Sequence, residues 1–305
     1  MKVLITGGAG YKGAVLAGRL LNEGHHVSIL DNFVYGFDSI LHLVNHQNLE
    51  IIRQDIRGLT SETLRSCDVI YHLAGLSGYP ACEANPHSAQ LINVEASRRL
   101  AELASPDQQV IYASTTSFYG SSGMVCDEDT PVQPVSLYGM TKYEAEQILM
   151  QRSNTISLRF ATIFGVSPRM RIDLLVNDFT FRAVNDRCIV LFDSEARRTF
   201  VHLQDAIAGY VFALSRRAEM KGQIYNVGGQ SLNYSKREIA EHISDATGCT
   251  IINSTIDDRD PRHFLVAFEK LTKLGYQTTY TLDDGIRELL KLYRFYNPIS
   301  TYATI

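Results

Sequence analysis

The sequence predicts an α/β protein with a doubly wound parallel sheet and a smaller C-terminal domain. An apolar run leads into a glycine-rich turn near the start, strand-like runs recur after it, and helix-length segments separate them. Alternation of this kind builds parallel βα units, whose ligands bind beyond the carboxyl ends of the strands. The expected strands are residues 3–5, 26–30, 50–53, 69–73, 110–113 and 156–160, and the expected long helices are 86–104 and 136–152.

Composition indicates an ordinary globular protein of 305 residues and net charge −4, which gives no electrostatic reason to expect nucleic acid. The five cysteines are scattered without C-x-x-C spacing, which argues against a disulfide framework or zinc ribbon. The first strand begins at Lys2, leaving no room for a signal peptide, and no apolar run approaches the roughly 18 residues that span a bilayer. We therefore expect a cytoplasmic protein without membrane partners.

The glycine-rich turn is the first site signal. Gly8, Gly10 and Gly13 fit the G-x-G-x-x-G spacing, which permits a tight turn and close approach of the backbone to a pyrophosphate at a helix N-terminus. Such a site also needs an acidic residue about 20 positions later, after the second strand, to bind a ribose hydroxyl. Asp31 occupies this place, 18 positions after Gly13. Together these features predict a Rossmann-type dinucleotide site.

Small or polar residues end the predicted strands, where a cofactor cleft is expected. Small residues also end strands for packing reasons alone, so these positions do not identify a ligand by themselves. The strand ends are Thr6-Gly7, Asp31-Asn32, Asp55-Ile56, Leu73-Ala74-Gly75 and Ser114-Thr115.

Tyr138 and Lys142 lie four residues apart on the second long helix and therefore share a face. Such a pair is common on solvated helices, but a hydroxyl-rich loop, residues 114–120, ends a strand of the same predicted sheet. A nearby ammonium, and a cationic nicotinamide if bound, would lower the pKa of a tyrosine from about 10. Tyr138 is therefore a candidate general base.

With these motifs, the chain resembles the extended short-chain dehydrogenase/reductases, in particular the nucleotide-sugar epimerase/dehydratase branch. Gly7, Gly10 and Gly13 match the Gly-x-x-Gly-x-x-Gly turn of that family, and the segment 138–142 matches its Tyr-x-x-x-Lys. Thr115 falls where the family places its catalytic Ser or Thr. The resemblance runs from Lys2 to about Phe295.

The resemblance implies NAD as cofactor and Thr115, Tyr138 and Lys142 as the catalytic set. Asp55-Ile56 would lie beside the adenine, and Asn93 in the helix behind the site. Asp31 favours NAD over NADP because its carboxylate would repel a 2′-phosphate. The implied cofactor contacts are Gly7, Gly10, Tyr11, Lys12, Gly13, Asp31, Asn32, Asp55, Ile56, Leu73, Ala74, Gly75, Asn93, Tyr138 and Lys142.

The sequence departs from the family pattern in two places. Lys12 stands where the family usually has an apolar residue. Thr116-Ser117 replaces the Asp-Glu pair that assists water elimination in the sugar 4,6-dehydratases. A dehydratase is therefore a weaker expectation than an enzyme that only moves a hydride.

The resemblance also implies contacts to a nucleotide-diphosphate sugar. Asn177 and Arg198 would contact the diphosphate, and Arg262 would grip the phosphates from the loop 258–262, because the planar fork of Arg binds phosphate oxygens in pairs. Arg198 could instead pair on the surface, and the loop 258–262 could be solvated with incidental charges. Ser77, Thr115 and Thr116 complete the expected substrate contacts. The histidines show no metal-ligand spacing, so no metal is expected.

Residues 1–165 are expected to form the dinucleotide-binding domain, with 199–217 returning to it, while 166–198 and 218–305 form the smaller substrate-binding domain. The implied activity is 4-epimerisation of a nucleotide-linked hexose by transient oxidation at C4. A one-way C4 dehydrogenase or a 4-keto reductase needs the same three catalytic residues and stays open. A catalytically inactive NAD-binding regulator would need none of them.

A homodimer is implied as well, through a four-helix packing of residues 86–104 and 136–152. Their apolar side chains could supply this contact or could pack only on their own sheet. These side chains are Leu91, Val94, Leu100, Leu103, Ala145, Ile148 and Leu149.

Overall fold

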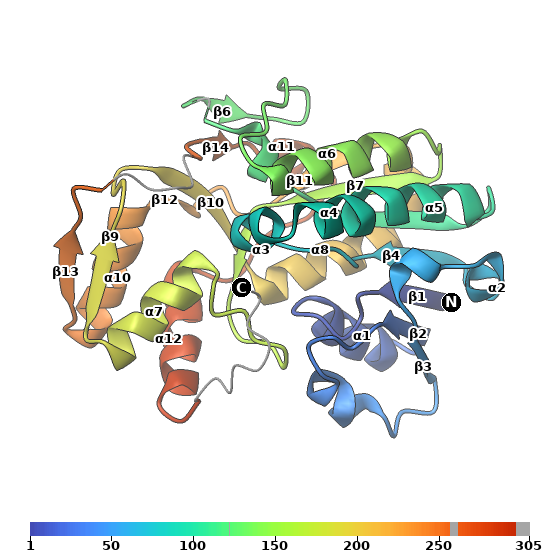
Figure 1. Ribbon diagram of the computed structural model, residues 1–305, viewed down its shortest axis with the longest axis horizontal. Coiled ribbons are helices and arrows are strands. Elements are labelled where there is room, and N and C mark those ends of the chain that lie inside the picture. The colour runs from blue at the N-terminus through green and yellow to red at the C-terminus, as the bar shows by residue number, and fades with distance from the viewer. Residues whose placement is uncertain (122, 257–261, 297–305) are drawn as a thin grey trace.

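A seven-stranded parallel sheet, in the order β11-β7-β5-β4-β1-β2-β3, organises the computed structural model, which describes residues 1–121, 123–256 and 262–296 (Figure 1). The strand order reverses between β1 and β4, which opens a crevice at their carboxyl ends. The Rossmann-type fold is confirmed. The strands are β1 Lys2–Thr6, β2 His26–Asp31, β3 Leu49–Arg53, β4 Val69–His72, β5 Gln109–Thr115, β7 Thr155–Phe160 and β11 Ile224–Val227.

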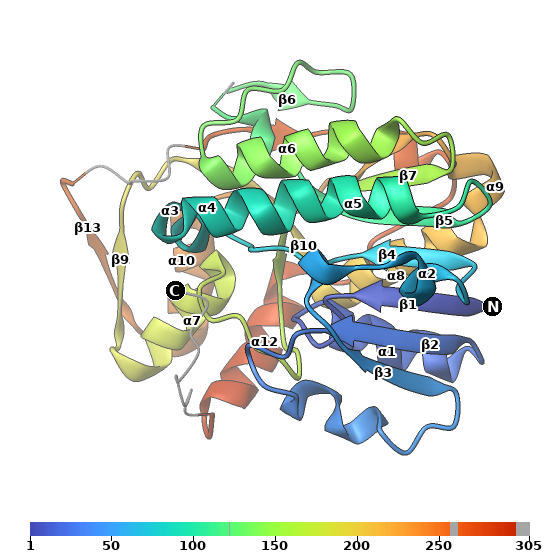
Figure 2. The same cartoon turned by 45° about the vertical axis from the view of Figure 1, so that its right-hand side comes forward.

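Helices cover both faces of this sheet, which explains its nearly continuous apolar strands. Along β1, Val3 and Ile5 enter one core with α1 (Gly13–Asn22) and α8 (Leu203–Ser215). Leu4 enters the other core, below the long helices that lie side by side in Figure 2. These helices are α4 Pro86–Ala89, the π-helical segment Gln90–Glu95 and α5 Ala96–Leu103, which continue one another, and α6 Leu137–Met150.

Four of the apolar side chains expected at a dimer contact are instead buried within the chain. Val94, Leu100, Ala145 and Leu149 are all fully buried, and the last three belong to the core beneath α5 and α6. The other three, Leu91, Leu103 and Ile148, are half-buried.

The smaller part of the molecule has its own apolar core, centred on side chains such as Phe164, Phe200 and Leu289. It combines a three-stranded sheet, a two-stranded sheet and three helices (Figure 1). These elements are β8 Thr162–Phe164, β10 Arg197–His202, β12 Asn233–Ser235, β9 Cys188–Leu191, β13 Thr250–Asn253, α7 Leu175–Asn185, α10 Lys236–Thr247 and α12 Leu282–Tyr293.

The boundary expected from the sequence differs from the structure after residue 218. Strand β11 pairs with β7 at the edge of the large sheet, so residues 224–227 do not belong to the smaller part. β14 (Leu265–Val266) pairs with β6 (Val125–Cys126), and its side chain Val266 enters the same core as Val227. The chain therefore returns twice to the larger part, because the apolar faces of these segments complete its core.

Short helical segments connect the main elements. They are η1 Asp38–Leu43, η2 Ile56–Gly58, α2 Ser61–Leu64, α3 Tyr79–Ala84, η4 Ser117–Tyr119, α9 Arg217–Met220 and α11 Glu269–Thr272.

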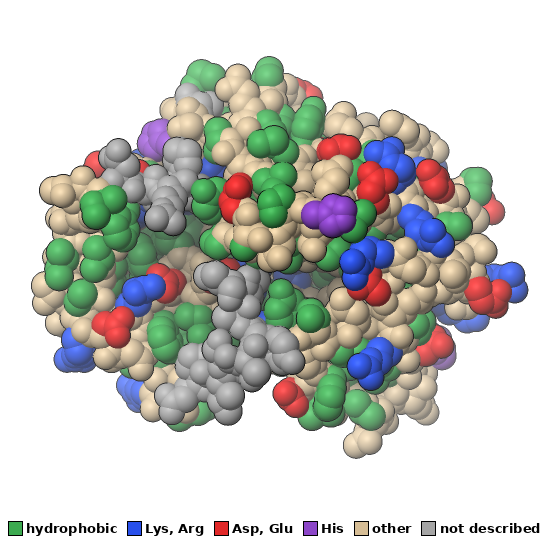
Figure 3. All heavy atoms as spheres, in the orientation of Figure 1, with side chains coloured by type: hydrophobic (Ala, Val, Ile, Leu, Met, Phe, Trp, Pro, Cys, Tyr) green, Lys and Arg blue, Asp and Glu red, His purple; other side chains and the backbone are tan. Residues whose placement is uncertain are grey.

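The surface carries mixed charge. On the face in Figure 3, coloured Lys and Arg side chains are interspersed with Asp and Glu, and they form no continuous basic patch there. None of the described helices has the length and apolar character needed to cross a membrane.

Candidate active site

A cavity of about 320 Å³ lies at the carboxyl ends of the central strands, between the glycine-rich turn and α6. It collects residues from β2, β5, β7 and β8, from the turns that follow β1 and β4, and from the segment that follows β8. Most residues expected at the site line it: Gly7, Gly10, Tyr11, Lys12, Gly13, Asp31, Asn32, Ile56, Leu73, Ala74, Gly75, Ser77, Thr115, Tyr138, Lys142 and Arg262.

The glycine-rich turn has the geometry of a phosphate cradle. Gly7 has a φ of +69° and donates its N–H to the Leu30 carbonyl at 2.8 Å. A Cβ on Gly13 would collide with the Gly7 carbonyl oxygen, so the helix can begin this close to the strand only with glycine. No side chain caps the N-terminus of α1, and the turn residues at this positive end of the helix line the cavity. These features fit a bound dinucleotide.

Asp31 lies beside this cradle, at the end of β2. Its carboxylate accepts hydrogen bonds from the backbone N–H groups of Ala9, at 3.0 Å, and Phe33, at 2.9 Å. Burial raises the pKa of Asp31, and these backbone donors act in the opposite direction. The carboxylate also lines the cavity, where it can accept a hydrogen bond from a ribose hydroxyl.

Asp55 does not line the cavity, although its neighbours Gln54 and Ile56 do. It forms an ion pair with Arg57 at 2.8 Å and accepts a hydrogen bond from Asn32 at 3.2 Å. The hydrogen bonds from the Arg57 side chain hold the pKa of Asp55 far below its usual range. Asp55 therefore orders the rim residue Asn32.

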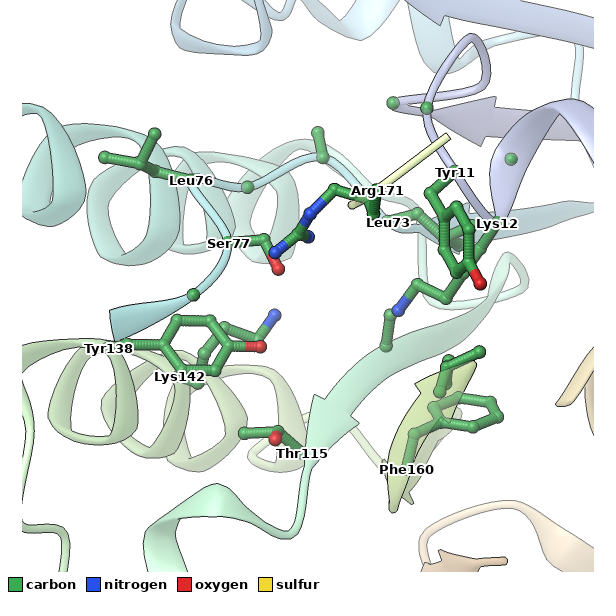
Figure 4. Close-up of a pocket in the computed structure, with 18 of the residues that line it drawn as sticks. Tyr11, Lys12, Leu73, Leu76, Ser77, Thr115, Tyr138, Lys142, Phe160 and Arg171 are labelled. Atoms are coloured by element: carbon green, nitrogen blue, oxygen red, sulfur yellow. The ribbon is translucent and has the colours of Figure 1, made fainter. Parts of the chain in front are cut away.

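The expected catalytic side chains meet at the other end of the cavity. Figure 4 shows Tyr138, Lys142 and Thr115 facing the same space, with Ser77 opposite them. Ser136 caps α6 by accepting the Gly139 N–H at 3.1 Å, which sets the start of the helix that carries Tyr138 and Lys142.

A hydroxyl pair orients Thr115. Its Oγ1 donates to Ser117 Oγ at 2.9 Å and accepts from the Ser117 N–H at 3.1 Å. Arg262 donates to the same Ser117 hydroxyl at 2.6 Å. Ser117 therefore connects Arg262 to Thr115 through hydrogen bonds. The other members of its expected loop, Asp258 to Pro261, lie outside the described residues.

The lowered pKa expected for Tyr138 is not found in the protein alone. Burial raises the pKa of Tyr138, and hydrogen bonds with Ser77 and Thr115 only partly oppose it. Burial also lowers the pKa of Lys142 well below its usual value, followed by repulsion from Lys12. The Lys142 ammonium lies 4.1 Å from the ring centroid of Tyr112. A cation bound in the cavity would lower the pKa of Tyr138, because nearby positive charge favours the phenolate over the phenol.

Asn93 lies behind the cavity wall. Its amide accepts the Leu76 N–H at 2.8 Å, donates to the Leu76 carbonyl at 3.0 Å, and donates to Thr141 Oγ1 at 3.0 Å. It thereby joins the strand end that carries Ser77 to α6, which carries Tyr138. Asn93 is a positioning residue whose π-helical segment is typical of functional sites.

Three expected substrate residues do not line the cavity. Thr116 donates to the Phe160 carbonyl at 3.2 Å, and Arg198 is only 3% exposed on β10. Asn177 accepts the Gly165 N–H at 3.0 Å and donates to the Arg171 carbonyl at 2.8 Å. The polar atoms of Thr116 and Asn177 bind backbone groups of the cavity wall, and Arg198 donates to the Arg197 carbonyl at 3.2 Å. Asn177 therefore shapes the loop 165–171.

Arg171 is a cavity residue that the sequence did not single out. Its guanidinium pairs with Asp173, with Nε 2.7 Å from Oδ1, and reaches into the space beside Ser77 (Figure 4). Nearby, the Arg169 guanidinium carbon lies 4.6 Å from the ring centroid of Tyr35 at the cavity edge. Neither arginine belongs to a motif, and only their close spacing after Gly165 could have drawn attention to them.

No cluster of three or more His, Cys, Asp or Glu side chains able to hold a metal ion occurs in residues 1–121, 123–256 and 262–296. The polar side chains that line the cavity carry carboxylate, amide, hydroxyl, ammonium and guanidinium groups.

Sequence comparisons agree with this geometry. A model described as the NAD dependent epimerase/dehydratase family matches residues 3–228. The chain is 29% identical to an uncharacterized UDP-glucose epimerase, YtcB, of Bacillus subtilis, over 94% of this chain and 96% of that protein. It is 26% identical to the UDP-glucose 4-epimerase of Corynebacterium glutamicum, over 92% of each.

Structure comparison gives a similar result. The UDP-glucuronic acid 4-epimerase from Bacillus cereus, crystallised with UDP-glucuronic acid and NAD, superposes with a TM-score of 0.86 at 25% identity. The superposition covers 96% of this chain and 99% of that one.

Proposed function

Because this chain belongs to the NAD-dependent epimerase/dehydratase family of enzymes, we propose that it inverts C4 of a nucleotide-linked hexose. The observation that carries this proposal is the meeting of Thr115, Tyr138 and Lys142 at one end of a cavity that begins at the glycine-rich cradle. The named relatives, two of them 4-epimerases of UDP-sugars, support the substrate class.

In this proposal Tyr138 takes the proton of the C4 hydroxyl as general base and later returns it. In the complex, the Thr115 hydroxyl turns its proton from Ser117 to the same oxygen and fixes its place. Lys142 favours the phenolate through its positive charge. NAD, when bound, supplies a reversible hydride acceptor. Net inversion requires the sugar to present its other face before the hydride returns, so the cavity must hold the nucleotide more firmly than the sugar.

The residues after Thr115 favour hydride transfer without water elimination. Elimination needs acid and base groups beside the sugar, and neither Thr116 nor Ser117 has a carboxylate. Thr116 binds the Phe160 carbonyl, and Ser117 accepts from Arg262. A one-way dehydrogenase would use the same catalytic set and is the alternative that an experiment must separate.

The test is incubation with UDP-glucose and with UDP-glucuronic acid, followed by proton NMR of the sugar. The proposal expects the C4 epimer at equilibrium with only trace NADH. A stoichiometric ketone with NADH would assign the one-way dehydrogenase, and a 4-keto-6-deoxy product would assign the dehydratase. Binding of neither sugar nucleotide would contradict the substrate class.

We also propose that the larger part holds NAD while the smaller part contributes to the nucleotide site, and that the enzyme works as a homodimer in the cytoplasm. Half-buried Leu91 and Ile148, with exposed Met140, leave apolar surface on the π-helical segment and on α6 for a second copy. All five cysteines are free thiols, which suits a reducing compartment. Light scattering at micromolar concentration tests the dimer, and a monomer would contradict it.

A further inference from the structure

Lys12 places an ammonium group at the catalytic end of the cavity. It starts from the glycine-rich turn, and its Nζ lies 5.2 Å from the ring centroid of Phe160 and 5.9 Å from that of Tyr210. Phe160 is the cross-strand partner of Thr115 in the sheet. Figure 4 shows the side chain extending into the space that Tyr138 and Lys142 face. An apolar residue at this place would line the cavity without charge.

The charge of Lys12 is not neutralised by a neighbouring acid. Within the part of the chain that the structure describes, its Nζ contacts aromatic rings and forms no hydrogen bond or ion pair. The charged side chains that interact with it are the cations Arg171 and Lys142. Burial, followed by repulsion from Arg171, lowers the pKa of Lys12 to about 8, so the ammonium still predominates at neutral pH. Arg171 differs because Asp173 pairs with it.

Lys12 also acts on the catalytic lysine. Lys12 and Lys142 both line the same cavity, and repulsion from Lys12 is the largest effect after burial in lowering the pKa of Lys142. Any other cation that enters this space meets the same repulsion. The oxidised nicotinamide is such a cation, whereas the reduced nicotinamide is neutral.

We propose that Lys12 shifts the bound cofactor toward its reduced form by repelling the oxidised nicotinamide. In the step concerned, the C4–H bond of the sugar breaks and its hydride forms a new C–H bond on the nicotinamide. The hydroxyl proton passes to Tyr138, the alcohol becomes a ketone, and NAD⁺ becomes NADH. This inference rests on the proposed function in one respect: it assumes that the nicotinamide binds at the end of the cavity where Tyr138 lies.

The decisive measurement is the ratio of bound NADH to bound NAD⁺ in the holoenzyme, equilibrated with an external redox couple of known potential. Lys12→Met keeps the length of the side chain and removes the charge, so we expect the ratio to fall about tenfold. For a two-electron couple that fall corresponds to about 30 mV. Lys12→Arg keeps the charge and should stay within about threefold of the parent protein.

Lys221→Met, which removes an exposed charge outside the cavity lining, is the matched control and should leave the ratio unchanged. Equal ratios in Lys12→Met and Lys221→Met would overturn the inference, as would a rise in the Lys12→Met ratio. If Lys12→Met does not fold, Lys12→Gln decides by the same criterion. A holoenzyme that holds no NAD(H) would instead contradict the proposed function, which separates the two failures.

Discussion

The carboxylate of Asp31 accepts a hydrogen bond from the backbone N–H of Ala9 at 3.0 Å. This contact joins the end of β2 to the glycine-rich turn, so the two sequence features that predict a dinucleotide site are physically one unit. Because Phe33 donates to the other carboxylate oxygen, at 2.9 Å, the carboxyl plane is fixed before any ligand binds. A ribose would meet an oriented acceptor.

The orientation of Asp31 predicts tighter binding of NAD(H) than of NADP(H). A 2′-phosphate would bring negative charge against this carboxylate, which should weaken binding by at least about tenfold. Asp31→Asn keeps the size of the side chain and one acceptor oxygen but removes the negative charge. It should therefore reduce the difference in affinity between NAD(H) and NADP(H) while weakening NAD binding. Fluorescence titration of both cofactors gives the dissociation constants. Equal affinity for NADP(H) in the parent protein would show that this account of Asp31 is wrong.

Gly13→Ala should abolish cofactor retention, because its Cβ has no room beside the Gly7 carbonyl oxygen. The collision involves backbone, so the turn must change shape to relieve it. Gly18→Ala, on the same helix, is the matched control: its Cβ would lie 3.4 Å from Leu43 Cδ2, an ordinary contact. The control should be neutral or up to about 1 kcal/mol more stable. Bound NAD(H) after purification and urea unfolding check both variants.

Local patterns in the sequence predicted the strands, the cradle and the positions of Tyr138 and Lys142. These features depend on residues that are close in sequence. Helix periodicity predicts that Tyr138 and Lys142 share a face, and glycine spacing predicts the phosphate cradle. Side-chain direction is less local. Thr116 and Thr115 are adjacent, yet Thr115 lines the cavity and Thr116 binds the Phe160 carbonyl, because β5 ends at Thr115 and the backbone turns into η4 at Thr116.

Long-range relationships were not predictable in the same way. β11 lies some 60 residues beyond its partner β7 in sequence, and nothing in its four residues indicates which sheet it joins. Arg171 enters the cavity only because Asn177 holds its carbonyl at 2.8 Å and Asp173 pairs with its guanidinium. The raised pKa of Tyr138 likewise follows from burial, a property of the whole fold.

His72 should make the protein less stable as the pH falls below about 6.5. Its ring is hydrogen-bonded to Thr6 at 2.8 Å and Ser97 at 2.9 Å, and burial lowers its pKa to about 3. Between these pH values the unfolded chain binds a proton that the folded protein excludes. The contribution of His72 to the free energy of unfolding is therefore fully present above pH 6.5 and is lost as the pH falls toward 3. At pH 5 the loss is about 2 kcal/mol.

Urea unfolding of the parent protein and His72→Gln at pH 7 and pH 5 isolates this contribution. The variant should be less stable at pH 7 but lose about 2 kcal/mol less between the two pH values. The same loss in both proteins would mean that carboxylates elsewhere cause the acid sensitivity.

Tyr138→Phe should separate chemistry from binding. The substitution removes only the phenol oxygen at the end of the cavity where Thr115 and Ser77 converge, so NAD and the sugar nucleotide should bind nearly as before. Without the general base, turnover should fall by roughly 10²- to 10⁴-fold. Tyr143→Phe, five residues further along the same helix and packed against Phe118, is the control and should keep full activity. Single-turnover hydride transfer, followed by NADH fluorescence, measures the loss directly. Full activity in Tyr138→Phe would exclude the phenol as the base, and a loss explained by weaker binding alone would assign it a positioning role.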